Sequence, residues 1–317
     1  MNDPIDARIA DLFSAAQTVG VVSHIRPDGD AVGSLLGLGL ALRAAGKTVQ
    51  TVLTDGVPPN LRHLPGAGEV VKRLSGQVDL AVVVDCSDLP RTGGALGSRE
   101  VDLVIDHHVT NLEFGKVNLV DPDEVATCAI LALRMPQWGL KIDTDVATDL
   151  LTGLIADTIG FRTSNMNSQA LRLAADLMDT GANLSDLYRR ALVQKSYEAA
   201  RYWGKGLDRL VREGGLVWTS LTLDDRRAVS YHGNDDADLV NVLSSIDGDV
   251  AVVFIEQHGG KVKVSWRSRP GIDVSNLALR FGGGGHPAAA GVEMQGDIEE
   301  VKNRVLTATR ELLDGSR

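Results

Sequence analysis

The stretch Val21-Val-Ser-His-Ile-Arg-Pro-Asp-Gly-Asp-Ala-Val-Gly-Ser34 decides how this chain is expected to fold. It closes a short apolar run with His24 and two carboxylates, Asp28 and Asp30, directly before a helical pattern begins. Open α/β sheets place their ligand crevices at the carboxyl ends of the strands, so these three side chains could converge there on divalent ions. The alternative is a strand-to-helix loop in which Asp30 only caps the helix.

The first half of the chain alternates strand-like and helix-like segments, a pattern typical of a mainly parallel α/β sheet. The expected strands lie near residues 18–23, 48–53, 79–85 and 101–106. The expected helices lie near residues 31–45, 65–75, 124–134, 144–158 and 167–180. Small residues recur at every fourth position of the first helix and predict a close approach to the sheet: Gly33, Gly37, Ala41 and Ala45.

The chain is expected to contain two domains joined by a linker. Residues 1–184 form the α/β domain, and the helical, highly charged residues 185–213 form the linker. Residues 214–317 form a smaller α+β domain, because strand patterns alternate there with helical ones and with a run of glycines. A length of 317 residues is ample for a core in each domain.

Composition and charge restrict the class of protein. A net charge of −10 argues against a broad basic surface for long nucleic acid or an anionic membrane. The two cysteines offer no disulfide framework, and the amino terminus lacks the basic segment and apolar core of a signal peptide. No apolar run approaches the roughly 20 residues that span a bilayer. We therefore expect a cytoplasmic protein with no membrane association.

Polar groups recur where later expected strands end. The run Leu80-Ala-Val-Val-Val-Asp85 is apolar until its final carboxylate, and Leu103-Val-Ile-Asp-His-His108 ends on three polar groups. Adjacent side chains of an extended segment point in opposite directions. We therefore expect one of His107 and His108 to bind a metal ion while its neighbour faces substrate.

A fourth cluster follows an expected helix, where Asp157 ends an apolar stretch and Arg162 lies just beyond it. Taken singly, such residues could form a turn, a buried histidine or an ion pair at a helix end. Together, the sequence would bring five carboxylates into one crevice, where they would repel one another unless cations neutralised them. Mixed imidazole and carboxylate donors favour manganese, with magnesium and cobalt as alternatives.

Two such ions, about 3.5 to 4 Å apart, could share a hydroxide that attacks phosphorus in line. No covalent nucleophile is then needed, so we interpret Cys86, beside Asp85, as a packing or supporting residue.

The expected second domain carries its own candidate ligand-binding residues. Val262-Lys-Val-Ser-Trp-Arg-Ser-Arg269 has the alternation of a strand that could present Arg267 to a cleft, with Trp266 in the core. The glycines at positions 282–285 would let the backbone approach a nucleotide, and His286 stands at the end of this run. The glycine run could also be a flexible turn.

These residues carry a family resemblance. In order, the motifs His24-Ile-Arg-Pro-Asp28-Gly-Asp30, Asp85, Asp106-His-His108 and Asp157 resemble those of the DHH phosphoesterases. Gly282-Gly-Gly-Gly-His286 with Ala288-Ala-Ala-Gly291 resembles the DHH-associated carboxyl-terminal domain. Within the superfamily the chain looks most like the two-domain nanoRNases that also act on pAp, a group that includes enzymes cleaving cyclic di-AMP or its linear product.

The resemblance implies a role for each residue of the motifs. One manganese would be held by His24, Asp28 and Asp85. The second would be held by Asp30, Asp85, His107 and Asp157, with Asp85 bridging the two ions. Asp106 would orient His107, and His108 would contact the scissile phosphate. The expected substrate-binding residues are Arg162, Arg267, Gly283, Gly284, Gly285 and His286.

The expected function is a manganese-dependent phosphoesterase that hydrolyses short RNA or DNA oligonucleotides to mononucleotides, and pAp to AMP and phosphate. The alternatives are a cyclic di-AMP phosphodiesterase, a RecJ-like single-strand exonuclease and a family II inorganic pyrophosphatase. A further alternative is not an enzyme: a nucleotide sensor that uses the same fold without catalysis. The sequence leaves a homodimer open and indicates no protein partner.

Overall fold

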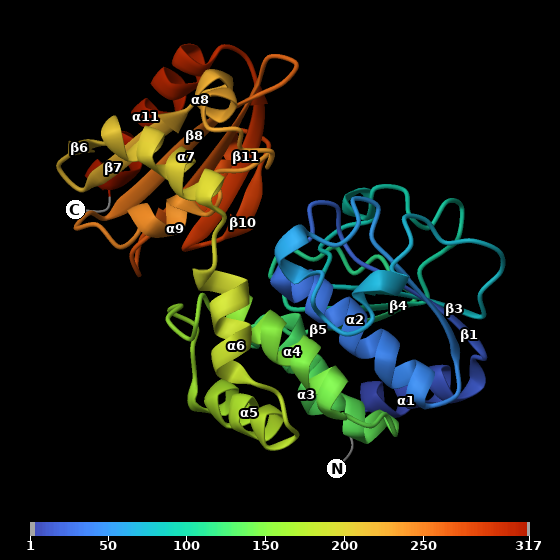
Figure 1. Ribbon diagram of the computed structural model, residues 1–317. Coiled ribbons are helices and arrows are strands. Elements are labelled where there is room, and N and C mark those ends of the chain that lie inside the picture. The colour runs from blue at the N-terminus through green and yellow to red at the C-terminus, as the bar shows by residue number, and fades with distance from the viewer. Residues whose placement is uncertain (1–3, 316–317) are drawn as a thin grey trace. The chain divides into compact units, whose positions relative to one another are not determined.

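The computed structural model describes residues 4–315, and the chain divides after Gln194 into two compact units (Figure 1). The first unit is built on a five-stranded parallel sheet, and the second unit is built on a six-stranded mixed sheet. The expected fold class, a parallel α/β domain followed by a smaller α+β domain, is confirmed. The function of residues 185–213 as a linker stays a prediction.

The sheet of the first unit determines where the candidate site lies. Its strand order is β2-β1-β3-β4-β5, and all neighbours are parallel. The strands are β1 (Thr18–Val22), β2 (Thr48–Val52), β3 (Leu80–Val84), β4 (Leu103–Asp106) and β5 (Val117–Val120). The first four agree with the predicted strands, and β5 was not predicted. Because the strands are parallel, the residues that follow β1, β3 and β4 meet at one edge.

Helices cover one face of this sheet and loops cover the other. The helices of the first unit are α1 (Pro4–Ala15), α2 (Gly29–Ala44), α3 (Thr127–Arg134), α4 (Thr144–Asp157), α5 (Ser168–Asp179) and α6 (Leu184–Tyr188). Val19 and Val21 of β1 pack with apolar residues of these helices, whereas Val22 packs with Leu96 and Phe114 from the loops. Each face thus has its own core.

The helix predicted over residues 65–75 is wrong. Only one 3-10 turn forms there, at Ala67–Glu69. Gly66 precedes it with a left-handed φ of 76°, which an α-helix cannot include. The rest of the segment runs alongside β2, where Val71 forms a bridge to Val52.

The two glycines of the predicted stripe on α2, Gly33 and Gly37, pack against α4 and not against the sheet, which corrects the prediction for them. A Cβ atom on Gly33 would lie 2.5 Å from the carbonyl oxygen of Asp149, and one on Gly37 would lie 2.9 Å from Cδ2 of Leu150. Both glycines are therefore required by the close approach of two helices. At the start of α2, a Cβ on Gly29 would lie 2.3 Å from Cβ of Ala156. This packing brings the end of α4 beside the start of α2.

The second unit has the strand order β10-β11-β9-β8-β7-β6, in which only β7 and β8 are parallel. The strands are β6 (Val211–Glu213), β7 (Leu216–Leu221), β8 (Val250–Gln257), β9 (Lys261–Ser268), β10 (Gly284–His286) and β11 (Ala289–Gln295). The helices are α7 (Tyr197–Asp208), α8 (Leu223–Ala228), α9 (Leu239–Leu243), α10 (Ser275–Arg280) and α11 (Ile298–Gly315). One core packs with α10 and α11, and the other packs with α7 and α9.

Within residues 4–315, no helix has both the length and the apolar character needed to cross a membrane.

Candidate metal centre

The turn between β1 and α2 supplies the first carboxylates of the site. Asp28 is the residue that caps α2, because its Oδ1 accepts hydrogen bonds from the backbone N–H groups of Asp30 (3.1 Å) and Ala31 (3.0 Å). The alternative in which Asp30 caps this helix is therefore wrong. Asp30 lies in the first turn and is buried, whereas the side chain of Asp28 is 63% exposed. His24 precedes the turn, and its Nε2 lies 4.0 Å from Oδ1 of Asp28.

Asp30 points at the start of α3. Its Oδ2 accepts a hydrogen bond of 2.7 Å from the backbone N–H of Thr127, and its Oδ1 accepts one of 2.9 Å from that of Cys128. Helix α3 has no side-chain cap from its own N-cap residue, Ala126, so Asp30 performs that function from another helix. Burial, together with the charge of Asp85, nevertheless raises the pKa of Asp30 well above its ordinary value. An ionised Asp30 therefore calls for a nearby cation.

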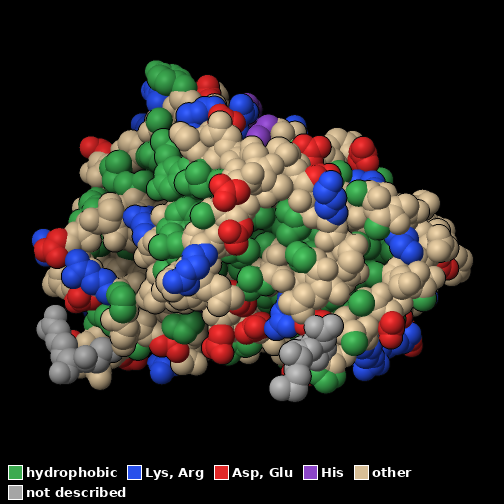
Figure 2. All heavy atoms as spheres, turned by 90° about the horizontal axis from the view of Figure 1, so that it is seen from below, with side chains coloured by type: hydrophobic (Ala, Val, Ile, Leu, Met, Phe, Trp, Pro, Cys, Tyr) green, Lys and Arg blue, Asp and Glu red, His purple; other side chains and the backbone are tan. Residues whose placement is uncertain are grey.

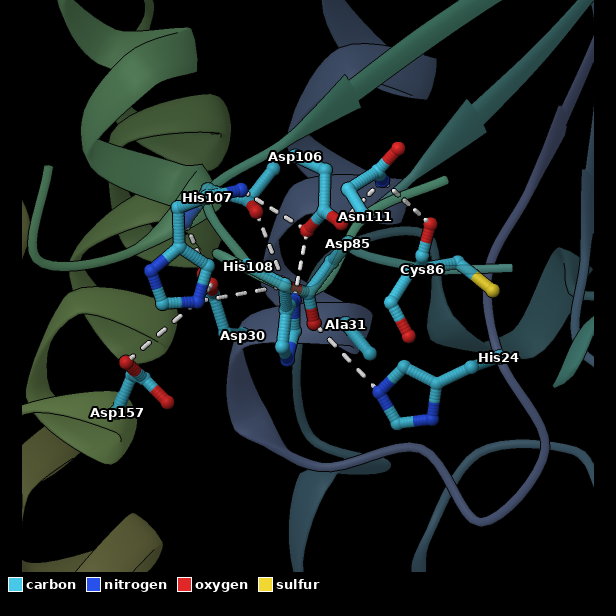
Figure 3. A network of polar contacts seen from close by, with 12 residues as sticks. His24, Asp30, Ala31, Asp85, Cys86, Asp106, His107, His108, Asn111 and Asp157 are labelled. Atoms are coloured by element: carbon cyan, nitrogen blue, oxygen red, sulfur yellow. Dashed lines mark hydrogen bonds and ion pairs between the residues drawn. The ribbon is translucent and has the colours of Figure 1, made fainter. Parts of the chain in front are cut away.

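Asp85 is the centre of the cluster (Figure 3). Its Oδ2 lies 3.5 Å from Nε2 of His24, and its Oδ1 lies 3.8 Å from Nε2 of His107 and 3.7 Å from Nδ1 of His108. Oδ1 also accepts a hydrogen bond of 2.9 Å from the hydroxyl of Thr127. Burial acts to raise the pKa of Asp85, but the surrounding imidazoles outweigh it and lower that pKa far below its ordinary value. Asp85 is thus an anion in the folded protein.

Asp106 contacts the ring of His108 and the backbone of His107, and its predicted role in orienting the ring of His107 stays a prediction. Its Oδ1 lies 2.7 Å from Nδ1 of His108 and accepts a hydrogen bond from the backbone N–H of His107 at 2.9 Å. Its Oδ2 accepts a hydrogen bond of 2.6 Å from Nδ2 of Asn111. The ring of His107 instead has its Nδ1 3.3 Å from the carbonyl oxygen of Glu124.

The electrostatic state of His108 follows from these contacts. Burial acts to lower the pKa of His108. The hydrogen bond to Asp106 and the charge of Asp85 outweigh burial and raise that pKa to about 9. The ring is therefore an imidazolium near neutral pH when no metal is bound.

His107 faces three carboxylates at once. Its Nε2 lies 3.9 Å from Oδ2 of Asp30, 3.8 Å from Oδ1 of Asp85 and 3.8 Å from Oδ2 of Asp157. These separations exceed hydrogen-bond length, yet His107, Asp30 and Asp85 are buried. Imidazole and carboxylate groups that converge in this way form the kind of donor set that binds a divalent ion.

The ligand-type atoms fall into three overlapping groups within the first unit. In each group the candidate atoms all lie within 4.8 Å of one another. The groups are His24, Asp28 and Asp85; Asp30, Asp85 and His107; and Asp85, Asp106 and His108. Asp85 belongs to all three. The donor set of imidazole and carboxylate, with a buried anion common to every group, fits divalent cations.

A strained turn follows Asp157 at the end of α4. Ile159, Gly160 and Phe161 have left-handed φ values of 48°, 72° and 66°. The hydroxyl of Thr158 accepts a hydrogen bond of 2.9 Å from the backbone N–H of Phe161 and so helps to hold this turn. A left-handed β-branched residue is costly, and such strain is found mainly at functional sites.

Other left-handed residues border the same site, since Arg26 has φ of 55° and Asp85 has φ of 51°. Arg162 lies beyond the strained turn and is exposed, and its role in substrate binding stays a prediction.

Sequence reasoning missed Thr127 and Asn111. Thr127 contacts both Asp30 and Asp85, and Asn111 donates to Asp106 and to the carbonyl oxygen of Cys86. No pattern in the sequence marks Thr127, because its importance depends on where α3 begins. Asn111 follows the Asp106-His-His108 motif by three residues, and that proximity was the available signal.

The second unit brings two of its predicted residues into one row of the sheet. Arg267 of β9 pairs with Ala289 of β11, which pairs in turn with His286 of β10. Side chains in one row point to the same face, and two strand spacings separate Arg267 from His286 by about 10 Å. Nε of Arg267 donates a hydrogen bond of 3.0 Å to Oδ1 of Asn241. Trp266 is fully buried, so its predicted place in the core is confirmed.

Packing explains some of the glycines at positions 282–285 but not all of them. A Cβ atom on Gly283 would lie 2.2 Å from the carbonyl oxygen of Gly291, and one on Gly285 would lie 2.4 Å from that of Ala289. These two positions are glycine because β11 packs against them. A Cβ on Gly284 would meet nothing within 4 Å, and its φ is not left-handed. Gly284 is therefore the position whose glycine the fold leaves unexplained.

Buried imidazoles and carboxylates that converge at the carboxyl edge of a parallel sheet are typical of metal-dependent enzymes. Two family models match the chain: "DHH family, N-terminal domain" over residues 18–155, and "DHHA1 domain" over residues 227–314. The bifunctional oligoribonuclease and PAP phosphatase NrnA of Thermus thermophilus is 36% identical over 311 residues, which cover 96% of this chain and 93% of the relative. The protein of the same name in Bacillus subtilis is 26% identical, and the match covers 89% of this chain and 91% of that relative.

A solved structure shares the fold across both units. An exopolyphosphatase-related protein of Bacteroides fragilis has a TM-score of 0.87 at 24% identity, covering 98% of this chain and 96% of the other. This chain belongs to the DHH family and carries a DHHA1 domain. The family and the enzyme class expected from the sequence are confirmed, and the assignment of individual ligands stays a prediction.

Proposed function

We propose that this protein hydrolyses short oligonucleotides to mononucleotides, and pAp to AMP and phosphate, with water activated between two divalent ions. The relatives from Thermus thermophilus and Bacillus subtilis are named for these two activities and match almost the whole chain. The observation that carries the proposal is the position of Asp85, which belongs to every group of ligand-type atoms in the first unit. One carboxylate shared between groups is what a two-metal phosphoesterase requires.

The proposed ligands are His24, Asp28 and Asp85 for one ion, and Asp30, Asp85, His107 and Asp157 for the other. When bound, the ions would supply an activated hydroxide and stabilise charge on the leaving oxygen. Asp85 would bridge them, since its two oxygens face His24 on one side and His107 on the other. Manganese is the proposed metal, because the donors mix imidazole and carboxylate, with magnesium and cobalt as alternatives.

His108 and Asp106 act on the substrate side of the proposed mechanism. The 2.7 Å contact with Asp106 fixes Nδ1 of His108, so Nε2 is the ring atom left to meet a phosphoryl oxygen. An imidazolium there would stabilise the negative charge that develops on that oxygen and could donate a proton to the leaving group. Asp106 is a positioning residue in this scheme.

The second unit is proposed to hold the end of the substrate. Arg267 and His286 point to one face of the sheet, beside the open position Gly284, and these three residues would bind the terminal nucleotide. Gly283 and Gly285 would contribute backbone N–H groups, and Arg162 remains proposed for the reaction centre. A cytoplasmic location and a homodimer are further proposals, testable by cell fractionation and by light scattering.

The charge of the protein favours short substrates. Figure 2 shows one face of the molecule, on which Lys and Arg side chains are scattered among Asp and Glu and form no continuous track. A long strand bound through many phosphates would show a salt slope near −0.7 per contact. A net charge of −10 would oppose such binding.

The test is a product-resolved assay with manganese across pAp, RNA and DNA of increasing length, cyclic di-AMP and pyrophosphate. We expect the highest catalytic efficiency at roughly two to five nucleotides, with a shallow dependence on salt. Efficiency that rose steadily toward long single strands would favour the RecJ-like alternative. Preference for cyclic di-AMP or pyrophosphate would favour the other enzymes, and binding without turnover would favour the nucleotide sensor.

A further inference from the structure

Arg91 is held firmly between the ends of two strands that carry the candidate site. Its carbonyl oxygen accepts a hydrogen bond of 2.7 Å from the backbone N–H of Ile25, the residue after His24. Its own backbone N–H donates a hydrogen bond of 2.9 Å to Oδ1 of Asp88. The next turn is closely packed as well, because a Cβ on Gly93 would lie 2.4 Å from Cγ2 of Ile25. The backbone at Arg91 is therefore fixed relative to both strand ends.

The guanidinium group of Arg91 has no carboxylate partner among the described residues. It is half-buried, and NH1 donates a hydrogen bond of 3.3 Å to the hydroxyl of Ser87. No ion pair of Arg91 within 4.0 Å exists among residues 4–315, although Asp85 and Asp88 are close along the chain. Ser87 lies two residues after Asp85, and Ile25, which donates to the carbonyl oxygen of Arg91, directly follows His24. The side chain is therefore anchored beside the two loops that carry these proposed metal ligands.

An arginine without an acidic partner is unexpected beside a cluster of carboxylates. A half-buried guanidinium is normally paired, because its desolvation is costly. A structural arginine here would be expected to bond a carboxylate in the bidentate manner that guanidinium geometry favours. The remaining N–H groups of Arg91 are instead available for an anion that arrives with the substrate.

We propose that Arg91 is a phosphate-binding residue of the metal centre, which donates hydrogen bonds to a non-bridging oxygen of the phosphoryl group. Ser87 holds one amino group of the side chain and so limits the directions in which the others can point. This inference rests on the proposed phosphoesterase function and adds Arg91 to the proposed substrate-binding residues. The competing explanation is that Arg91 only joins the loops after β1 and β3, which its backbone contacts alone achieve.

The test uses inorganic phosphate as the probe and the manganese-loaded full-length protein. Phosphate affinity is measured by titration calorimetry for the wild type, Arg91→Met, Arg91→Lys and the control Arg73→Met. Arg73 is an exposed arginine of the same unit that makes no ion pair in the described part of the chain. Manganese content and thermal melting are measured for each protein.

We expect Arg91→Met to weaken phosphate binding at least tenfold, which corresponds to about 1.4 kcal/mol, with manganese content unchanged. Arg91→Lys should bind phosphate more tightly than Arg91→Met but more weakly than the wild type. Lysine keeps the positive charge and lacks the planar set of N–H donors of a guanidinium group. Arg73→Met should bind phosphate as the wild type does. The proposal would be overturned if Arg91→Met bound phosphate as tightly as the wild type, including the case in which the substitution lowered only the melting temperature.

Failure of this inference can be told apart from failure of the proposed function. If Arg91→Met binds phosphate normally while the wild type cleaves oligonucleotides and pAp, only the assignment of Arg91 is wrong. If the wild type cleaves neither substrate, and Arg91→Met binds phosphate more weakly than the wild type does, Arg91 binds an anion but the proposed function is wrong.

Discussion

The hydroxyl of Thr127 donates a hydrogen bond of 2.9 Å to Oδ1 of Asp85. The backbone N–H of the same residue donates one of 2.7 Å to Oδ2 of Asp30, and all three residues are buried. One residue at the start of α3 therefore fixes carboxylates from two other elements, α2 and the end of β3. In each carboxylate, the fixed oxygen also faces Nε2 of His107.

The first prediction concerns this hydroxyl. Thr127→Val keeps the shape of the side chain and removes the hydrogen bond to Asp85, so manganese affinity should fall about tenfold or more, as for other residues that orient metal ligands. Titration calorimetry with manganese on the metal-free protein measures the change. Thr127→Ser should retain most of the affinity. Thr152→Val is the matched control, because the buried hydroxyl of Thr152 bonds only within α4. Equal affinities for Thr127→Val and Thr152→Val would contradict the prediction.

The second prediction separates metal binding from covalent catalysis. Asp85→Asn should abolish turnover and reduce the bound manganese measured by elemental analysis. The substitution removes the negative charge of the one carboxylate that is proposed to bind both ions. Cys86→Ser should keep activity within a few-fold of wild type. Burial raises the pKa of the Cys86 thiol to about 12, so this side chain is no thiolate at neutral pH. Equal losses of activity in the two variants would show that Asp85 has no special place in the site.

The third prediction uses the glycine run of the second unit. Gly284→Ala should leave the melting temperature unchanged, since its Cβ meets no atom within 4 Å, but should raise KM for a dinucleotide if substrate backbone approaches there. Gly283→Ala is the comparison, and it should lower the melting temperature because its Cβ would lie 2.2 Å from a carbonyl oxygen. An unchanged KM in Gly284→Ala would remove this position from the proposed substrate site.

The fourth prediction concerns Asp149, a buried residue of α4 whose two carboxylate oxygens have no hydrogen-bond partner in the described structure. Burial raises the pKa of this carboxyl well above its ordinary value. The folded state therefore favours the protonated form, and its stability falls as the pH rises above about 4, the unfolded value. Asp149→Asn avoids that cost and should stabilise the protein by about 1 to 3 kcal/mol at pH 7.

The gain from Asp149→Asn should shrink toward zero near pH 4, which melting curves at several pH values would reveal. Asp176→Asn, an exposed change on α5, should give no gain at any pH. A stabilisation independent of pH would mean that Asp149 is not the titrating group.

The candidate site was predictable from the sequence where it depends on strand ends. Asp85 and His107 each follow an apolar run, and the parallel order of β1, β3 and β4 brings such positions together without further information. The position of Asp157 at the end of a helical stretch was also readable, because the apolar pattern of α4 stops there.

The rest depends on tertiary packing that no local pattern encodes. Thr127 contacts Asp30 across 97 residues of sequence, and only the packing of α3 beside α2 creates that contact. The stripe of Gly33 and Gly37 indicated a close approach, but the sequence could not tell whether a helix or the sheet was the partner. The contact between Asp106 and the ring of His108 depends on how the chain turns after β4, which periodicity does not describe.

The left-handed backbone at Ile159 sets a limit on engineering this protein for heat resistance. A β-branched residue in that conformation costs on the order of 1 to 3 kcal/mol, so we expect a screen for thermal stability alone to favour Ile159→Gly or Ile159→Asn. The same relaxation would loosen the turn that follows Asp157, a proposed metal ligand. A screen that scores heat resistance without activity would thus enrich less active variants at this position, and a library intended to preserve turnover should leave it unchanged.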